Sequence, residues 1–151
     1  MLLMEHFITV VILQSKKDSR NLAEETEDIL TTISSKKVFV IPVPLSSQAL
    51  AFAKNPEKHV ELVVWHYQFQ SDYDDPVFEN TKALLKYGTP VLLIRSNSEP
   101  YQFKRRMNNW VKKLGADEKE PLHICTMPEY PETVRKIIAD QISRTDFLSK
   151  T

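Results

Sequence analysis

Short apolar segments alternate along this chain with amphipathic ones, and this alternation constrains the fold more than any other feature. The apolar segments are rich in branched and aromatic side chains, as strands are, and cover residues 7–14, 38–43, 60–69, 89–94 and 122–125. Between them, apolar residues recur at helical spacing. Strands that alternate with helices pair in parallel through right-handed crossovers. The sequence therefore predicts an α/β fold: a three-layer, doubly wound domain on a mainly parallel five-stranded sheet, whose strand order stays open.

Two helices are expected in the N-terminal half of the chain. The first covers about residues 19–33, with Asp18 or Ser19 as its N-cap. The second is short, covers 46–54 and precedes a break at Asn55-Pro56.

Proline and glycine mark the three helices expected in the C-terminal half. Asp75-Pro76, Glu99-Pro100 and Pro131 start them, because proline is favoured in the first helical turn. The chain has two glycines, Gly88 and Gly115, and each follows one of these helices, where a left-handed C-cap favours glycine. Neither glycine lies in a loop that follows a predicted strand.

Length and composition indicate one domain, over residues 1–146, with a polar tail over 147–151. Twenty basic and twenty acidic side chains balance, so direct binding of nucleic acid is not expected. The longest apolar run, residues 7–13, is too short to span a bilayer, and no membrane partner is expected. The single cysteine, Cys125, cannot form an internal disulfide, which favours a reducing compartment, the nucleus or the cytoplasm.

Ligands of parallel α/β sheets bind at the carboxyl ends of the strands, so the loops there are the first place to look for chemistry. The loop after the first strand, residues 14–21, contains no glycine. Its side chains would hold a pyrophosphate away from the backbone amides that must bind it. We therefore expect no cofactor, and neither GTP nor GDP should bind.

The order of elements resembles a small GTPase that has lost its nucleotide site. In that family the first loop carries Gly-x-x-x-x-Gly-Lys-Ser/Thr, and the equivalent positions here are Gln14, Ser19, Arg20 and Asn21. The guanine-reading motif would fall on residues 96–99, where only the charge of its last position is kept, and the switch hairpin is missing.

This combination resembles the centromere protein M family, inner-kinetochore subunits that keep a GTPase fold but bind no nucleotide. The likeness rests on element order and on the apolar sequence of residues 41–47 and 60–65. It implies a non-catalytic pseudo-GTPase scaffold, located in the nucleus at the centromere, with a helical-repeat kinetochore subunit as its partner.

A receiver domain shares the same layout and is the first alternative. Its chemistry requires an acidic pair after the first strand, an Asp after the third and a Lys after the fifth. The residues near these positions are Gln14 and Ser15, His66 and Tyr67, and Met127. A receiver-like signalling domain is therefore expected to lack phosphoryl chemistry.

A Toll/interleukin-receptor domain is the second alternative, because residues 15–18 and 71–79 are similar to its early loop and its catalytic-glutamate helix. Enzymatic members cleave the glycosidic bond of NAD, and Glu79 would be the catalytic residue. A Glu one turn into a helix is commonly only a favourable charge near its N-terminus. We expect no catalysis unless Glu79 lines an open cleft.

Aromatic residues mark the first candidate partner surface. Trp65 lies in the third strand, while Tyr67, Phe69 and Tyr73 continue past its expected end into a loop. Aromatic side chains in such places anchor protein partners, although they can equally form a lid over an inert pocket.

A basic helix face is the second candidate partner surface. Lys104, Arg105 and Arg106 are followed on the same predicted helix by Lys112 and Lys113. Such a face binds an acidic partner or is simply solvated.

Neither the histidines nor the cysteine form a recognisable site. His6, His59, His66 and His123 are scattered without metal-ligand spacing, so no zinc site is expected. Cys125 is expected to be a buried, inert thiol.

Overall fold

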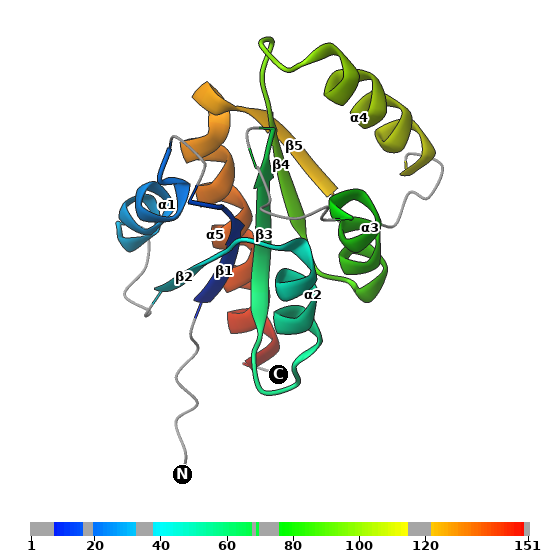
Figure 1. The fold of residues 1–151 in the computed structure, drawn as a ribbon. Helices are drawn as coiled ribbons and strands as arrows, with labels where there is room; N and C mark the ends of the chain where they lie inside the picture. Colours follow the sequence, from blue (N-terminus) through cyan, green and yellow to red (C-terminus); the bar gives the residue numbers. More distant parts are fainter. Residues whose placement is uncertain are drawn as a thin grey trace.

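The computed structural model describes residues 8–16, 20–32, 38–67, 69, 76–114 and 122–149, with side chains up to residue 143 (Figure 1). The strands are β1 (Ile8–Leu13), β2 (Val38–Val43), β3 (Val60–His66), β4 (Val91–Arg95) and β5 (Leu122–Thr126). The helices are α1 (Leu22–Thr31), α2 (Ser46–Lys54), α3 (Val77–Tyr87), α4 (Tyr101–Leu114) and α5 (Tyr130–Ser149), and a 3₁₀ turn, η1 (Met127–Glu129), precedes α5. In this part of the chain, no helix is long and apolar enough to cross a bilayer.

The five strands form one sheet in the order β2-β1-β3-β4-β5, and every neighbouring pair is parallel. The predicted doubly wound α/β fold is confirmed. The strand order, which the sequence left open, is the flavodoxin-like one, and its direction reverses between β1 and β3.

Helices cover both faces of the sheet, and each face has its own hydrophobic core (Figure 1). Successive residues of a strand point to opposite faces: Val10 and Ile12 of β1 pack with α1 and α5, whereas Val11 and Leu13 pack with α2, α3 and α4. All residues of β3 are buried. A central strand covered on both sides favours apolar side chains, and five of the seven residues of β3 are apolar, with Glu61 and His66 as the exceptions.

Helix α1 begins later than its sequence pattern predicts. Its N-cap is Asn21, whose Oδ1 accepts a hydrogen bond from the Glu24 amide at 3.2 Å. The Gln14 side chain accepts a second one, from the Ala23 amide at 2.8 Å. These two side chains satisfy amides of the first turn, so the prediction of Asp18 or Ser19 as the cap is wrong; both lie outside the described residues.

The glycine that ends α3 behaves as predicted. Gly88 has a φ of 96°, and its amide donates to the carbonyl oxygens of Leu84 and Leu85. Gly115 lies outside the described residues, as does Asp75. Pro76 itself is the N-cap of α3 and offers no side-chain hydrogen bond.

Other element boundaries also differ from the predictions, most clearly at the end of β3 and at both ends of α5. Strand β3 ends at His66, so the expected extension to residue 69 is wrong. Helix α5 begins at Tyr130, one residue before Pro131, because η1 leads into it, and it extends to Ser149. Residues 147–149, which we expected in a polar tail, are therefore helical.

Candidate functional site

The carboxyl end of β1 is occupied by the neutral side chain of Gln14. Its Nε2 donates to Asn21 Oδ1 at 3.1 Å, in addition to the bond that its Oε1 accepts from Ala23. The backbone N–H of Gln14 donates to Val43 O at 3.0 Å. A carboxylate that could hold Mg²⁺ is absent from this position, and the Ala23 and Glu24 amides at the start of α1 are already used by the protein.

The carboxyl end of β3 turns tightly and is joined to β4. His66 is buried, and its carbonyl accepts the Phe69 amide at 2.9 Å. The Tyr67 amide donates to Ile94 O at 3.1 Å, and the Tyr67 hydroxyl lies 3.3 Å from Ser98 Oγ. Phe69 packs partly buried against the core of the α2/α3/α4 face. Tyr73 lies outside the described residues.

The carboxyl end of β4 holds a bidentate ion pair. Arg95 Nε and Nη2 each lie 3.0 Å from an oxygen of Glu99, whose side chain is 1% exposed. Glu99 Oε1 also accepts the Ser96 amide at 3.0 Å. The carboxylate at the guanine-reading position of a GTPase is therefore bound by the protein's own groups.

At the carboxyl end of β5, a carboxylate is likewise bound by groups of the protein itself. Glu129 Oε1 accepts hydrogen bonds from the amide of Thr126 at 2.9 Å and from its hydroxyl at 2.7 Å, forming a capping box. These hydrogen bonds lower the pKa of the Glu129 carboxyl. Met127, near the position of a receiver's lysine, packs against the α1/α5 core.

The remaining candidates for chemistry are separated from one another. Glu79 is exposed on the first turn of α3, next to Asn80, which donates to Ser46 Oγ at 2.8 Å. Cys125 is buried as expected, and burial raises the pKa of its thiol to about 11, although a hydrogen bond with Thr133 opposes the shift. His6 lies outside the described residues, and the residues that are described include no group of ligands suited to a metal ion.

Trp65 belongs to the core and not to an exposed aromatic surface. It is 1% exposed, and its ring meets those of Phe78, Phe103 and Trp110 edge-on at 5.2, 6.1 and 6.0 Å. Aromatic contacts thus join α4 to β3 and α3.

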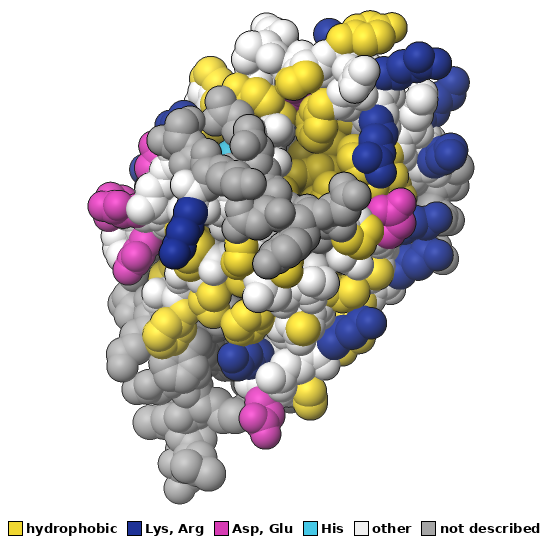
Figure 2. Space-filling model, viewed as in Figure 1, with side chains coloured by type: hydrophobic (Ala, Val, Ile, Leu, Met, Phe, Trp, Pro, Cys, Tyr) yellow, Lys and Arg dark blue, Asp and Glu magenta, His cyan; other side chains and the backbone are white. Residues whose placement is uncertain are grey.

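The basic face of α4 is exposed to solvent beside this aromatic cluster. Lys104 and Arg105 are exposed, while the Arg106 guanidinium lies 4.2 Å from the centroid of the Phe78 ring. Figure 2 shows the Lys and Arg side chains gathered over this part of the molecule. Among the partner-binding candidates that the structure describes, Lys104, Arg105 and Arg106 are exposed on α4, whereas Tyr67 and Phe69 are partly buried.

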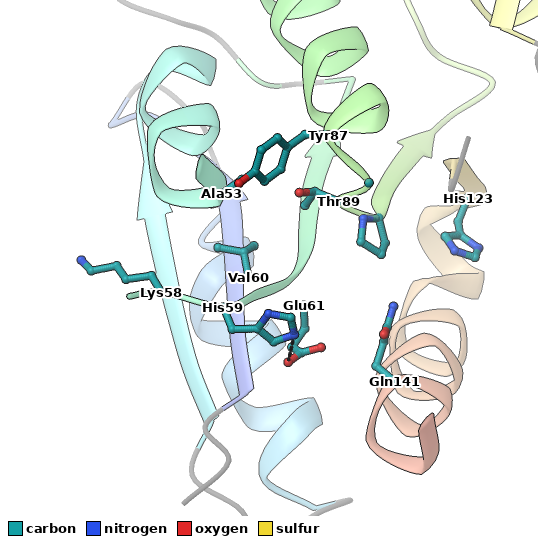
Figure 3. A pocket seen from close by; sticks show the side chains of 11 residues that line it. Ala53, Lys58, His59, Val60, Glu61, Tyr87, Thr89, His123 and Gln141 are labelled. Carbon is teal, nitrogen blue, oxygen red and sulfur yellow. Dashed lines mark ion pairs between the residues drawn. The ribbon is translucent and has the colours of Figure 1, made fainter. Parts of the chain in front are cut away.

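A cavity of about 490 Å³ lies at the opposite edge of the sheet, at the amino ends of β3, β4 and β5 (Figure 3). Its lining residues come from these strand ends and from the ends of neighbouring helices: Ala53, Lys58, His59, Val60, Glu61, Tyr87, Gly88, Thr89, Pro90, His123 and Gln141. We did not predict this site, because ligands are expected at strand carboxyl ends. The only local signal was His59-x-Glu61, which places an ionisable pair at the start of a buried strand.

No family model matches this sequence, and no curated protein matches it. Solved structures do share the fold. A response regulator receiver domain protein from Clostridium thermocellum is 11% identical with a TM-score of 0.57, covering 93% of this chain and 98% of its own. A receiver protein from Sinorhizobium medicae is 11% identical with a TM-score of 0.55, covering 88% and 92%.

A third solved structure contains the same fold as part of a larger protein. The Francisella novicida lysine decarboxylase LdcF is 12% identical with a TM-score of 0.50, and the match covers 91% of this chain but 17% of that one. At such identities the likeness concerns the fold alone. By its fold, the chain is a flavodoxin-like α/β domain, an architecture that it shares with these receiver structures.

Proposed function

We propose that this chain is a receiver-like domain that performs no phosphoryl chemistry and acts by binding protein partners. The observation that carries the proposal is the state of Gln14, a neutral amide bound to Asn21 and Ala23 where a receiver needs an acidic pair. The ends of β4 and β5 support it, because Glu99 and Glu129 are used in internal contacts. Because the protein's own side chains occupy the carboxyl ends of these strands, we place its function on the rest of its exposed surface.

Exposure to a phosphodonor tests this proposal. The purified protein is incubated with acetyl phosphate and Mg²⁺, beside an active receiver domain as positive control, and analysed by intact mass spectrometry under neutral conditions. We expect no phosphoryl adduct, and neither Mg²⁺ with GTP nor with GDP should raise the melting temperature. An adduct on any Asp or His residue, or a nucleotide-dependent stabilisation of several degrees, would contradict the proposal.

The basic face of α4 supports an acidic protein partner. Lys104 and Arg105 are exposed there, and Arg106 packs over Phe78, which orients its charge. The chain as a whole has no net charge, so an attractive field must be local to such a face.

The more specific hypothesis, that the protein is a kinetochore scaffold in the nucleus, is supported by the sequence resemblance to the centromere protein M family. A stable complex with a helical-repeat kinetochore subunit in size-exclusion chromatography would favour it. Failure of the two proteins to co-elute would leave the receiver-like proposal as the better one.

A further inference from the structure

The cavity at the amino edge of the sheet has the size of a small-molecule site. Its volume of about 490 Å³ falls within the range of about 300–1,000 Å³ found for ligand pockets. Residues far apart in the sequence surround it, from Ala53 near the end of α2 to Gln141 on α5 (Figure 3). It lies at the other end of the strands from Gln14.

A carboxylate supplies the charge that faces the cavity. The side chain of Glu61 is only 10% exposed, and its Oε1 lies 3.1 Å from His59 Nε2. A carboxylate can accept about four hydrogen bonds, so contacts within the protein, such as the one with His59, do not exclude a ligand N–H. Lys58, the only Lys or Arg among the described lining residues, directs its Nζ to the ring of Phe52, 4.3 Å from the centroid, and extends away from Glu61 (Figure 3).

Two helices, each with a lysine in its last turn (Lys54 in α2 and Lys86 in α3), also end at the cavity. Helices α2 and α3 both terminate at the cavity, which Ala53 and Tyr87 line. The C-terminus of a helix carries a partial negative charge of about half an electron and favours cations. The helix ends and Glu61 therefore favour the same sign of ligand.

The rest of the lining suits an organic cation better than a metal ion. Tyr87 is 56% exposed and offers an aromatic face, which attracts organic ammonium groups. Thr89 and Gln141 contribute a hydroxyl and an amide. His59, Glu61 and His123 all line the cavity, yet the described residues do not form a metal-binding group.

We propose that this cavity binds a small organic amine in its protonated form, with the buried carboxylate of Glu61 as the partner of the ammonium group. The site is independent of the proposed receiver-like function, because it shares no residue with the carboxyl edge or with the basic face of α4. Either of the two proposals can therefore fail without the other.

Three probes with the same four-carbon chain test the charge preference: 1,4-diaminobutane, 1,4-butanediol and succinate. Each is titrated at constant ionic strength into ¹⁵N-labelled protein, and amide shifts are followed at Gly88, Thr89 and His123. We expect saturable shifts with the diamine and none with the diol or the diacid. Equal shifts with all three probes, stronger shifts with succinate, or no shift at millimolar diamine would overturn the proposal.

Matched variants test the role of the carboxylate. Glu61→Gln keeps the shape and removes the charge, and should weaken diamine binding about tenfold or more, equivalent to about 1.4 kcal/mol. Glu57→Gln removes an exposed carboxylate outside the lining and should leave binding unchanged. If Glu61→Gln does not fold, Tyr87→Ala at the exposed rim provides the second variant, and it should weaken binding severalfold. Unchanged diamine affinity in the folded Glu61 variant, or in the Tyr87 variant where it replaces it, would refute the proposal.

Discussion

The hydroxyl groups of Thr26 and Tyr130 lie 2.6 Å apart in the interior, although 104 residues separate them along the chain. The Thr26 hydroxyl donates to Leu22 O at 2.7 Å, so Tyr130 donates the bond between the two side chains. Burial raises the pKa of the Tyr130 hydroxyl and keeps it a donor at neutral pH. This bond joins α1 to α5 across the core of one face of the sheet.

Removing the acceptor should therefore destabilise the protein. Thr26→Val leaves the buried Tyr130 hydroxyl without this partner and should lower the free energy of unfolding by about 1–3 kcal/mol. Urea denaturation followed by circular dichroism measures the change. Thr26→Ser, which keeps the hydroxyl, is the control and should lose less; equal losses in the two variants would contradict the role of the bond.

Thr81 on α3 should respond to the same substitution in the opposite direction. Its hydroxyl is buried and has no hydrogen-bond partner within the part of the chain that the structure describes. Thr81→Val replaces a buried polar atom with a methyl group of similar size, so stability should stay unchanged or rise by up to about 1 kcal/mol. The same urea titration applies, and a loss as large as that of Thr26→Val would show that the Thr81 hydroxyl has a partner.

The Cys125 thiol should make the protein less stable in alkali. Burial raises its pKa from 9.0 to about 11, so in this window the folded chain binds more protons than the unfolded chain. The protonated thiol therefore contributes to the free energy of unfolding in full below its pKa in the unfolded chain, and this contribution is lost as the pH rises from about 9 to about 11. Cys125→Ser should flatten the alkaline decline in melting temperature, while Tyr130 retains its own part; an unchanged slope would argue against this assignment.

The basic face of α4 should bind acidic peptides through its exposed charges. The double variant Lys104→Glu/Arg105→Glu should abolish binding of a fluorescent poly-glutamate peptide at low salt, measured by anisotropy, and added salt should weaken wild-type binding. Lys82→Glu/Lys86→Glu on α3 makes the same change of charge elsewhere on the surface and should retain most of the binding. A similar loss in both variants would indicate net charge rather than this face.

Glu79 should have no catalytic role. It is exposed on the first turn of α3, so Glu79→Gln should leave the melting temperature nearly unchanged, and the wild-type protein should not consume NAD. Chromatographic assay for nicotinamide release measures this. Turnover by the wild-type protein that disappears in the variant would establish the Toll/interleukin-receptor-like alternative.

The order of strands and helices could be predicted without a structure, because each element depends on a pattern within one segment. Branched residues predicted β3, and Gly88 predicted the end of α3 through a local need for positive φ. The expectation that phosphate chemistry is absent also came from the sequence alone, since residues 14–21 contain no glycine and Gln14 and Ser15 stand where a receiver needs its acidic pair.

Which residues meet across the sheet could be learned from the three-dimensional structure alone. Sequence patterns could not show that Gln14 binds the start of α1, that Trp65 is enclosed by α3 and α4, or that Glu61 faces a cavity. These contacts depend on the β2-β1-β3-β4-β5 order and on how each helix crosses the sheet. Local periodicity reports which face of an element is apolar, but the partner of that face is set by packing between segments distant in the chain.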